Sequence, residues 1–329
     1  MAIITRLLKN EAFPAWNNFV DEHPCGTIFH KTTWLQLIDP RVKIYAVFND
    51  EEIKAGVALV STKKNAVSGY HIPPYTQYFS PLYGNADQKK NSLTEEHTCI
   101  KAILDEMADA AHVDFKLPKG HQSILPYHWK GYESSVSITH IITGNLADYL
   151  RDLNRNKLRE LKKLQGLVNA GEIIIEHAIH EADLQHLLKQ TEERKSFDGR
   201  SALAIDLVMK STDDIANKFI IRSKEHGLIA FGFFPYDKRA VYNLINASVR
   251  VTDPVLKTIN LLLLFQAIEF ALNSGRTFDF EGSMLPGVEA FCRLMGGVQV
   301  PVYRVQKSSS LRYSLLRAAK QIKNDRRKT

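Results

Sequence analysis

The chain has 329 residues, enough for two domains, and its 44% hydrophobic and 24% charged content is typical of a globular protein. Its three cysteines, Cys25, Cys99 and Cys292, are far apart and form no CxxC pair, which argues against a disulfide framework or a zinc site. The net charge of +7 favours polyanionic ligands without identifying one.

The sequence predicts neither a signal peptide nor a membrane span. Residues 1–16 carry charges at Arg6, Lys9 and Glu11 and contain no apolar core of signal-peptide length. The most hydrophobic run, 261–272, is interrupted by two polar residues and is expected to be too short to cross a bilayer. Together with the cysteine pattern, these features favour a cytoplasmic protein.

The predicted elements follow the same order in both halves of the chain. The first half predicts helices at 13–20 and 33–38, hairpin strands at 43–48 and 53–61, a Pro- and Tyr-rich loop at 73–84, and a helix at 92–112 followed by 113–118. The second half predicts helices at 181–195 and 213–226, hairpin strands at 228–235 and 241–248, a helix at 255–273 and a strand at 277–281.

An Asp-Phe pair closes each of these runs, at Asp114 and at Asp279, 165 positions apart. Repetition at about half the chain length indicates two similar α/β units, arisen by duplication or convergence. The boundary is expected near 142–146, which gives units of 1–144 and 145–310 and a basic C-terminal segment at 311–329. The groove between two such units is the default ligand site.

The strand expected at 277–281 is the strongest candidate for chemistry. Side chains alternate along a strand, so Asp279 and Glu281 are expected to project from one face. Two carboxylates in a buried strand need a partner or a task, because burying an unpaired charge is costly. Gly282 and Ser283 then turn the chain at the strand's end, where α/β proteins usually bind ligands. The alternative is the solvated face of an edge strand.

A leucine-periodic segment at 149–163 predicts a helix with one buried face and one basic face. Its basic face includes Arg155, Lys157 and Arg159, and could bind the phosphates of a nucleotide-bearing donor or of RNA. The alternative is a solvated helix surface.

Two further basic segments are open to the same pair of interpretations. Arg194 and Lys195 end a predicted helix, where they could contact a ligand or simply favour the helix C-terminus. The tail at 311–328 has basic residues interleaved with leucines, which fits either a membrane- or RNA-binding helix or a helix docked on the body with a frayed end.

The loop at 70–84 is rich in tyrosine and proline, and Tyr75, Gln77 and Tyr78 are its candidate contacts with an acceptor substrate. A merely packed loop is the alternative. The sequence contains no GxGxxG, P-loop, GxSxG or HExxH motif, and its twelve histidines are scattered, so we expect no metal centre.

Several short motifs together resemble FemAB-like proteins, which are bacterial acyltransferases built from two GNAT-type units. The resemblance begins at Trp16–Val20 and Gly26–Leu35, continues through the basic helix and Arg194-Lys195, and ends in 278–283, 291–297 and 302–305. It therefore covers both halves, and implies two tandem GNAT-like units, each with a mixed, largely antiparallel sheet flanked by helices.

The resemblance implies transfer of an acyl or aminoacyl group to an amine, in some relatives for cell-envelope or polysaccharide pathways. The donor could be acyl-coenzyme A or aminoacyl-tRNA, and tRNA is not favoured as a partner. In that reaction Glu281 would be the base, Asp279 its substitute or orienter, and Arg293 with amides near Ser283 the oxyanion or donor contacts. No tightly bound cofactor is expected.

The sequence departs from the family pattern at two places. Relatives that use tRNA donors often have Phe-Lys where Phe291 is followed here by Cys292 and Arg293. The Gly-rich pyrophosphate loop of GNAT enzymes is replaced by 247–254, which has no glycine. These departures leave a second hypothesis open, a GNAT-fold binding module that has lost its donor site.

Overall fold

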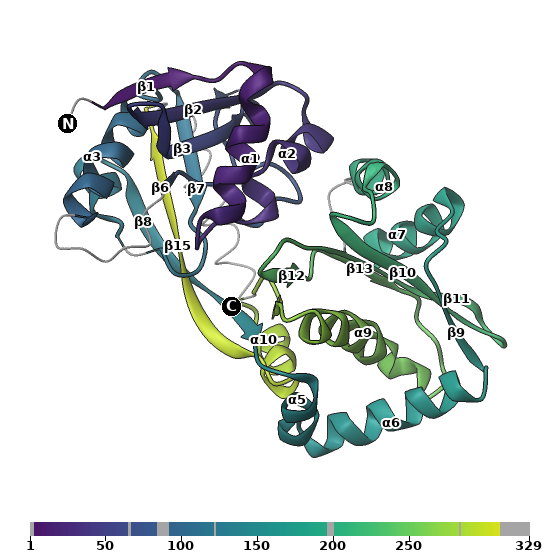
Figure 1. Ribbon diagram of the computed structural model, residues 1–329. Coiled ribbons are helices and arrows are strands. Elements are labelled where there is room, and N and C mark those ends of the chain that lie inside the picture. The colour runs from purple at the N-terminus through teal and green to yellow at the C-terminus, as the bar shows by residue number, and fades with distance from the viewer. Residues whose placement is uncertain are drawn as a thin grey trace, which may run out of the picture. The chain divides into compact units, whose positions relative to one another are not determined.

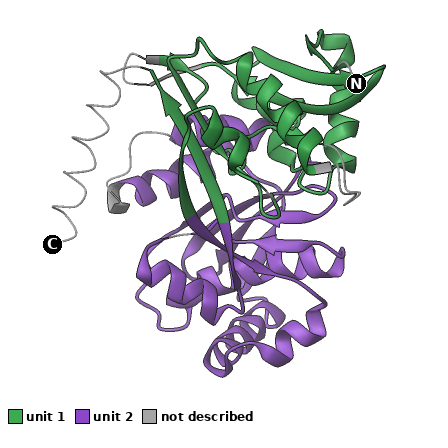
Figure 2. Ribbon diagram, turned by 90° about the vertical axis from the view of Figure 1, so that its left-hand side faces the viewer, with its two compact units in different colours: residues 1–136, 302–329 green, residues 137–301 purple. Residues whose placement is uncertain are grey.

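The computed structural model divides the chain into two compact units (Figures 1 and 2). Unit 1 is formed by residues up to 136 and from 302 onward, and unit 2 by 137–301. The structure describes residues 3–64, 67–83, 92–121, 123–195, 201–282 and 284–309, with only the backbone at 62–64, 67, 92 and 193–195.

The two divisions between the units fall inside long strands, β8 (Glu133–Ile142) and β15 (Val298–Ser308). The sequence instead placed a single boundary at 144/145, after the first of these strands. The C-terminal part of β15 belongs to unit 1, because Arg304–Ser308 pairs antiparallel with His112–Lys116 of β7. The predicted basic tail at 311–329 lies outside the described residues.

Unit 1 is built around an antiparallel sheet of order β1-β2-β3-β6. Trp16 and Trp34 are fully buried in its core, and the ring of Trp16 lies so close to Gly56 that a Cβ there would be 2.5 Å from it. The helices and strands of unit 1 are β1 Ile4–Leu7, η1 Asn10–Ala12, α1 Phe13–Glu22, η2 Ile28–His30, α2 Thr32–Ile38, β2 Val42–Asn49, β3 Glu52–Val60, β4 Thr62–Lys64, β5 Val67–Gly69, β6 Leu82–Tyr83, α3 Ser92–Asp105, β7 His112–Lys116 and α4 Leu125–Trp129.

Unit 2 has an antiparallel sheet of order β13-β11-β10-β9, and a second group of strands in which β14 lies between β12 and β8. Its elements are α5 Leu146–Asp152, α6 Arg155–Asn169, β9 Ile173–Glu176, α7 Glu181–Lys195, α8 Ser201–Lys210, β10 Ala216–Ser223, β11 Gly227–Pro235, β12 Ala240–Tyr242, β13 Ile245–Ser248, η3 Leu256–Thr258, α9 Ile259–Asn273, β14 Thr277–Asp279 and α10 Pro286–Leu294.

Helix α9 is the core helix of unit 2 and packs against β11, β14 and α6 (Figure 1). Among the described residues, Leu256–Asn273 is by length and composition able to cross a membrane, contrary to the sequence expectation for this run. However, 61% of this stretch is buried inside the protein, which is the pattern of a core helix.

The mixed α/β architecture is confirmed, with antiparallel hairpins and one parallel pair, β12 with β14. Several element predictions were wrong. The helix expected at 213–226 is strand β10, because Phe219, Ile220 and Ile221 pair with β11 rather than forming a helical face. The helix expected at 92–112 ends at Asp105, and the chain enters β7 at His112.

Candidate functional site

Strand β14 ends at Asp279, whose side chain has no exposed surface. The carboxylate Oδ1 accepts a hydrogen bond from Thr139 Oγ1 at 2.6 Å and another from the backbone amide of Glu281 at 2.9 Å. Both donors are neutral, and both fix the position of the chain that leaves the strand. Asp279 therefore acts as an orienting residue for the turn at the strand's end.

Glu281 lies beyond the strand rather than within it, which corrects the prediction that Asp279 and Glu281 share one strand face. Its backbone has a φ of 61°, in the left-handed region, and Gly282 follows with a φ of 71°. A Cβ at Gly282 would be 2.1 Å from the carbonyl oxygen of Ile138. The turn therefore requires glycine there, both for its dihedral angle and for the close approach of β8.

Two residues of β8 contribute to this region, and the sequence analysis did not identify them. Thr139 anchors Asp279, and His140 is fully buried, with its backbone carbonyl accepting from the amide of Phe280 at 2.9 Å. The His140 Nε2 atom is 3.8 Å from Glu289 Oε1 of α10. No local signal in the sequence pairs β8 with β14.

Cys292 and Arg293 are neighbours on α10, but the first is buried and the second is mostly exposed. Cys292 is buried, and burial, followed by the nearby Glu289 carboxylate, raises its thiol pKa to about 11. Arg293 is mostly exposed and donates from Nε to Glu289 Oε1 at 3.1 Å. The guanidinium predicted to support an oxyanion is thus held by an acidic residue one turn earlier.

The single strand expected at 241–248 is two strands in the structure, β12 and β13, which belong to different sheets. Residues of β12 pair in parallel with β14, and the amide of Asn243 still donates to the Asp279 carbonyl at 2.9 Å. Ile245–Ser248 forms β13, which pairs with β11 and is an edge strand of its sheet. The amide of Val249 donates to Ile229, so by alternation the backbone groups of Asn246 and Ser248 face the outer edge.

The segment expected at the pyrophosphate-loop position starts η3 and α9 with an acidic cap. Asp253 Oδ1 accepts hydrogen bonds from the backbone amides of Val255 and Leu256, both at 2.8 Å. A phosphate group at this helix start would compete with that carboxylate for the same amides and would be repelled by its charge.

The basic segment predicted as one helix is two, because α5 ends at Asp152 and α6 starts at Arg155. Asn154 caps α6 by accepting from the amides of Asn156 and Lys157. The Lys157 ammonium pairs with Glu160 at 2.7 Å, so its charge is compensated.

Arg155 and Arg159 are exposed on α6, and Arg159 donates to Asn156 Oδ1 at 3.2 Å. Among the predicted phosphate-binding residues whose side chains the structure describes, these two cations are exposed. The side chains of Arg194 and Lys195 at the end of α7, and all of Ser283, lie outside what the structure describes.

The proposed acceptor contacts all belong to unit 1. Tyr75 is half-buried with a positive φ of 53°, whereas Gln77 is buried and Tyr78 has no exposed surface. The Tyr78 ring packs edge-on against Phe29, and this core position contradicts its predicted role as a surface contact. No group of three or more His, Cys, Asp or Glu side chains that could hold a metal is found in the described parts of the chain.

The repeated Asp-Phe motif places an aspartate at the same kind of position in both units. Asp114 of β7 and Asp279 of β14 are both buried in strands. Asp114 accepts two hydrogen bonds from the Arg304 guanidinium, one of them from Nε at 2.7 Å, whereas Asp279 accepts from a hydroxyl and an amide. The unit 1 carboxylate is thus used in a structural ion pair.

Comparisons by sequence give no match, either to a protein-family model or to a curated protein. Solved structures do match. FemX has a TM-score of 0.68 at 14% identity, over 91% of this chain and 96% of FemX. L-PGS from Bacillus licheniformis has a TM-score of 0.54 at 14% identity, over 94% and 95% of the two chains.

A tandem GNAT protein from the clavulanic acid biosynthesis pathway has a TM-score of 0.55 at 9% identity, over 94% of this chain and 99% of that protein. At these identities the likeness concerns the fold. It extends over nearly the whole of each chain, so it includes both α/β units. The chain therefore has the FemAB-like fold, with two tandem GNAT-like units.

Proposed function

We propose that the chain is an N-acyltransferase that moves an acyl or aminoacyl group to an amine, with Glu281 as the base. The observation that carries this proposal is the rigid turn at the end of β14. There a buried carboxylate, Asp279, holds the amide of a second acidic residue, Glu281, which has a left-handed backbone. The fold shared with FemX and tandem GNAT proteins supports the same reaction class.

The reaction needs a group that removes a proton from the attacking amine. As the nitrogen attacks the acyl carbon, the bond from that carbon to the donor's oxygen or sulfur breaks, and the amine proton passes to the Glu281 carboxylate. The leaving group then takes up a proton in its turn. Asp279 has no exposed surface, so its role is to position Glu281 rather than to accept the proton.

The developing oxyanion requires hydrogen-bond donors that are fixed before the reaction. Arg293 is held by Glu289, so we assign this role instead to backbone amides on the outer edge of β13. An extended acyl donor could lie along that edge as an added strand, paired with the outward backbone groups of Asn246 and Ser248.

The donor's phosphates do not fit the start of α9, where Asp253 occupies the first amides. We place them instead against the exposed Arg155 and Arg159 of α6. This argues against coenzyme A bound in the manner of GNAT enzymes, and the donor would be an aminoacyl-tRNA or an acyl-coenzyme A whose phosphates are held by α6.

The Asp253 cap also supports a second candidate function, a binding module that has kept the fold and lost the donor site. Thermal-shift measurements with acyl-coenzyme A thioesters and with aminoacyl-tRNA separate the two, since a donor that binds the native state stabilises it by mass action. If neither donor class changes the melting temperature, the binding-module function is favoured.

Once a donor and amine acceptor are found, Glu281→Gln tests the catalytic assignment. The amide cannot take the proton, so turnover should fall about 10²-fold or more with donor affinity unchanged. Glu225→Gln, at the exposed turn between β10 and β11, is the matched control and should retain full turnover. Unchanged turnover in the Glu281 variant would remove that residue from the role of base.

A further inference from the structure

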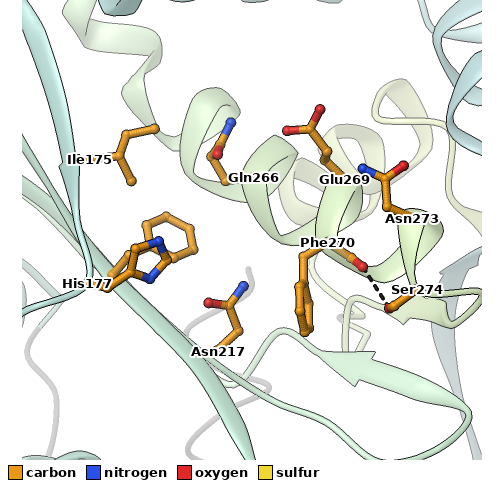
Figure 3. Close-up of a pocket in the computed structure, with 9 residues that line it drawn as sticks. Ile175, His177, Asn217, Gln266, Glu269, Phe270, Asn273 and Ser274 are labelled. Carbon is orange, nitrogen blue, oxygen red and sulfur yellow. Dashed lines mark hydrogen bonds between the residues drawn. The ribbon is translucent and has the colours of Figure 1, made fainter. Parts of the chain in front are cut away.

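A pocket of about 510 Å³ opens in unit 2 between the strands β9 and β10 and the C-terminal half of α9 (Figure 3). Its apolar base is formed by Ile175, Phe219 and Phe270. Side chains of α9 face it from one side, and Asn217 of β10 and His177, which directly follows β9, face it from the other. The volume is within the range of small-molecule sites in proteins.

Four polar side chains that line this pocket have no hydrogen-bond partner among the described residues: Asn217, Gln266, Glu269 and Asn273. Three of them, Gln266, Glu269 and Asn273, lie on α9. By contrast, His177 Nδ1 contacts the Lys218 carbonyl at 3.2 Å, and the Ser274 hydroxyl donates to the Phe270 carbonyl at 2.7 Å. The pocket therefore has unused amide groups and a carboxylate around an apolar base.

The electrostatics of the pocket favour a cation. Glu269 is the one formally charged residue in its lining, and burial raises its carboxyl pKa. The pocket also lies at the C-terminal end of α9, where the helix dipole is negative.

The basic side chains within two residues of the pocket residues Asn217 and Ser274 in the sequence, Lys218 and Arg276, make contacts elsewhere. The Lys218 ammonium donates to the carbonyls of Ser211 and Val208 at 2.5 and 3.2 Å. The Arg276 Nε atom donates to the Asp237 carbonyl at 2.6 Å, and its guanidinium lies 5.0 Å from the centre of the Tyr236 ring. Neither of these contacts supplies a counter-ion to Glu269.

We propose that this pocket binds an organic amine with an apolar or aromatic body. The ammonium group pairs with Glu269, the body packs on Phe219 and Phe270, and the free amides of Asn217, Gln266 and Asn273 bind polar substituents. A charged partner for a partly buried carboxylate recovers the cost of its desolvation.

This site is separate from the proposed acyl-transfer site. The pocket lies where α9 ends at Asn273, before the chain enters β14 at Thr277, whereas Glu281 follows the other end of that strand. The inference therefore does not depend on the proposed function, and it gives unit 2 a second ligand site.

Phenethylammonium is a suitable probe, because it joins an aromatic ring to a primary ammonium. Binding to the full chain is measured by calorimetric titration, beside 2-phenylethanol and 3-phenylpropionate, which have the same ring with a neutral or an anionic end. We expect the ammonium compound to bind most tightly, and Glu269→Gln to weaken it about tenfold while leaving the alcohol unaffected.

Two controls keep the test decisive. Glu225→Gln removes an exposed carboxylate of unit 2 outside the pocket and should leave binding unchanged. Gln266→Leu fills one wall with an apolar side chain of similar length and should change the affinity for all three compounds. Equal binding of the three compounds, undiminished ammonium binding by the Glu269 variant, or no binding at millimolar concentration would overturn the proposal.

Discussion

Replacing Gly282 by alanine should destabilise unit 2 more than the dihedral angle alone explains. Gly282 has a φ of 71°, and a Cβ there would be 2.1 Å from the Ile138 carbonyl oxygen and 2.7 Å from the Thr139 Cα. Both contacts are with backbone atoms of β8, which pairs with β14 and cannot move aside as a flexible side chain could.

The expected cost is the sum of two effects. A left-handed backbone costs an L-residue about 1–2 kcal/mol, and forcing an extra carbon into a packed position costs about 1–3 kcal/mol. Gly282→Ala should therefore lower the free energy of unfolding by about 2–5 kcal/mol. Gly275 offers a matched control, because its φ is 69° and nothing lies within 4 Å of its Cβ position. Gly275→Ala should cost only the first part, about 1–2 kcal/mol.

Urea denaturation followed by far-ultraviolet circular dichroism measures both variants. Tryptophan fluorescence reports unit 1 alone, because Trp16, Trp34 and Trp129 all belong to it. The Gly282 variant should shift the dichroism transition to lower urea than the Gly275 variant does. Equal shifts would refute the argument, since they would mean that the Ile138 carbonyl gives way without cost.

Three other predictions follow from buried polar groups. Asp279→Ala leaves the Thr139 hydroxyl and the Glu281 amide without this acceptor and should cost about 1–3 kcal/mol for each, whereas Asp279→Asn keeps an oxygen and should cost less in the same denaturation assay. Burial, aided by neighbouring histidines, lowers the pKa of His30 to about 3, so the unfolded chain takes up a proton near pH 6.5 that the native imidazole does not. The stability of unit 1 should thus fall as pH drops from 7, by about 2 kcal/mol at pH 5, and fluorescence-monitored urea curves of His30→Gln should show a smaller fall. Burial raises the thiol pKa of Cys292 to about 11, so iodoacetamide at pH 8 should label it in the native protein far more slowly than in urea, as mass spectrometry of the peptides would show.

Elements with a strong local pattern were predictable from the sequence. The helix expected at 181–195 coincides with α7, and the hairpin expected at 43–48 and 53–61 agrees with β2 and β3 to within one residue at each end. Their apolar spacing and turn residues are contained in the segment itself, so no distant contact is needed to decide them.

Features that depend on pairing between distant segments were not predictable. The residues of β10 have an apolar spacing that fits a helix, and only the neighbouring strands β9 and β11 decide for a strand. Thr139 meets Asp279 across 140 positions, and no local signal relates them. The loop that contains Tyr78 has the composition of a recognition loop, yet the Tyr78 ring is buried in the core of unit 1.

The two aspartates of the repeated motif show how one position can have different consequences in two similar units. Asp114 is paired with the Arg304 guanidinium, so its charge is compensated within unit 1 and its place in β7 is structural. Asp279 instead accepts hydrogen bonds from the Thr139 hydroxyl and from the Glu281 amide. Through the Glu281 amide it helps to fix the turn that places this second carboxylate after β14. This hydrogen bond to the turn, rather than the motif itself, is the reason for proposing the chemistry in unit 2.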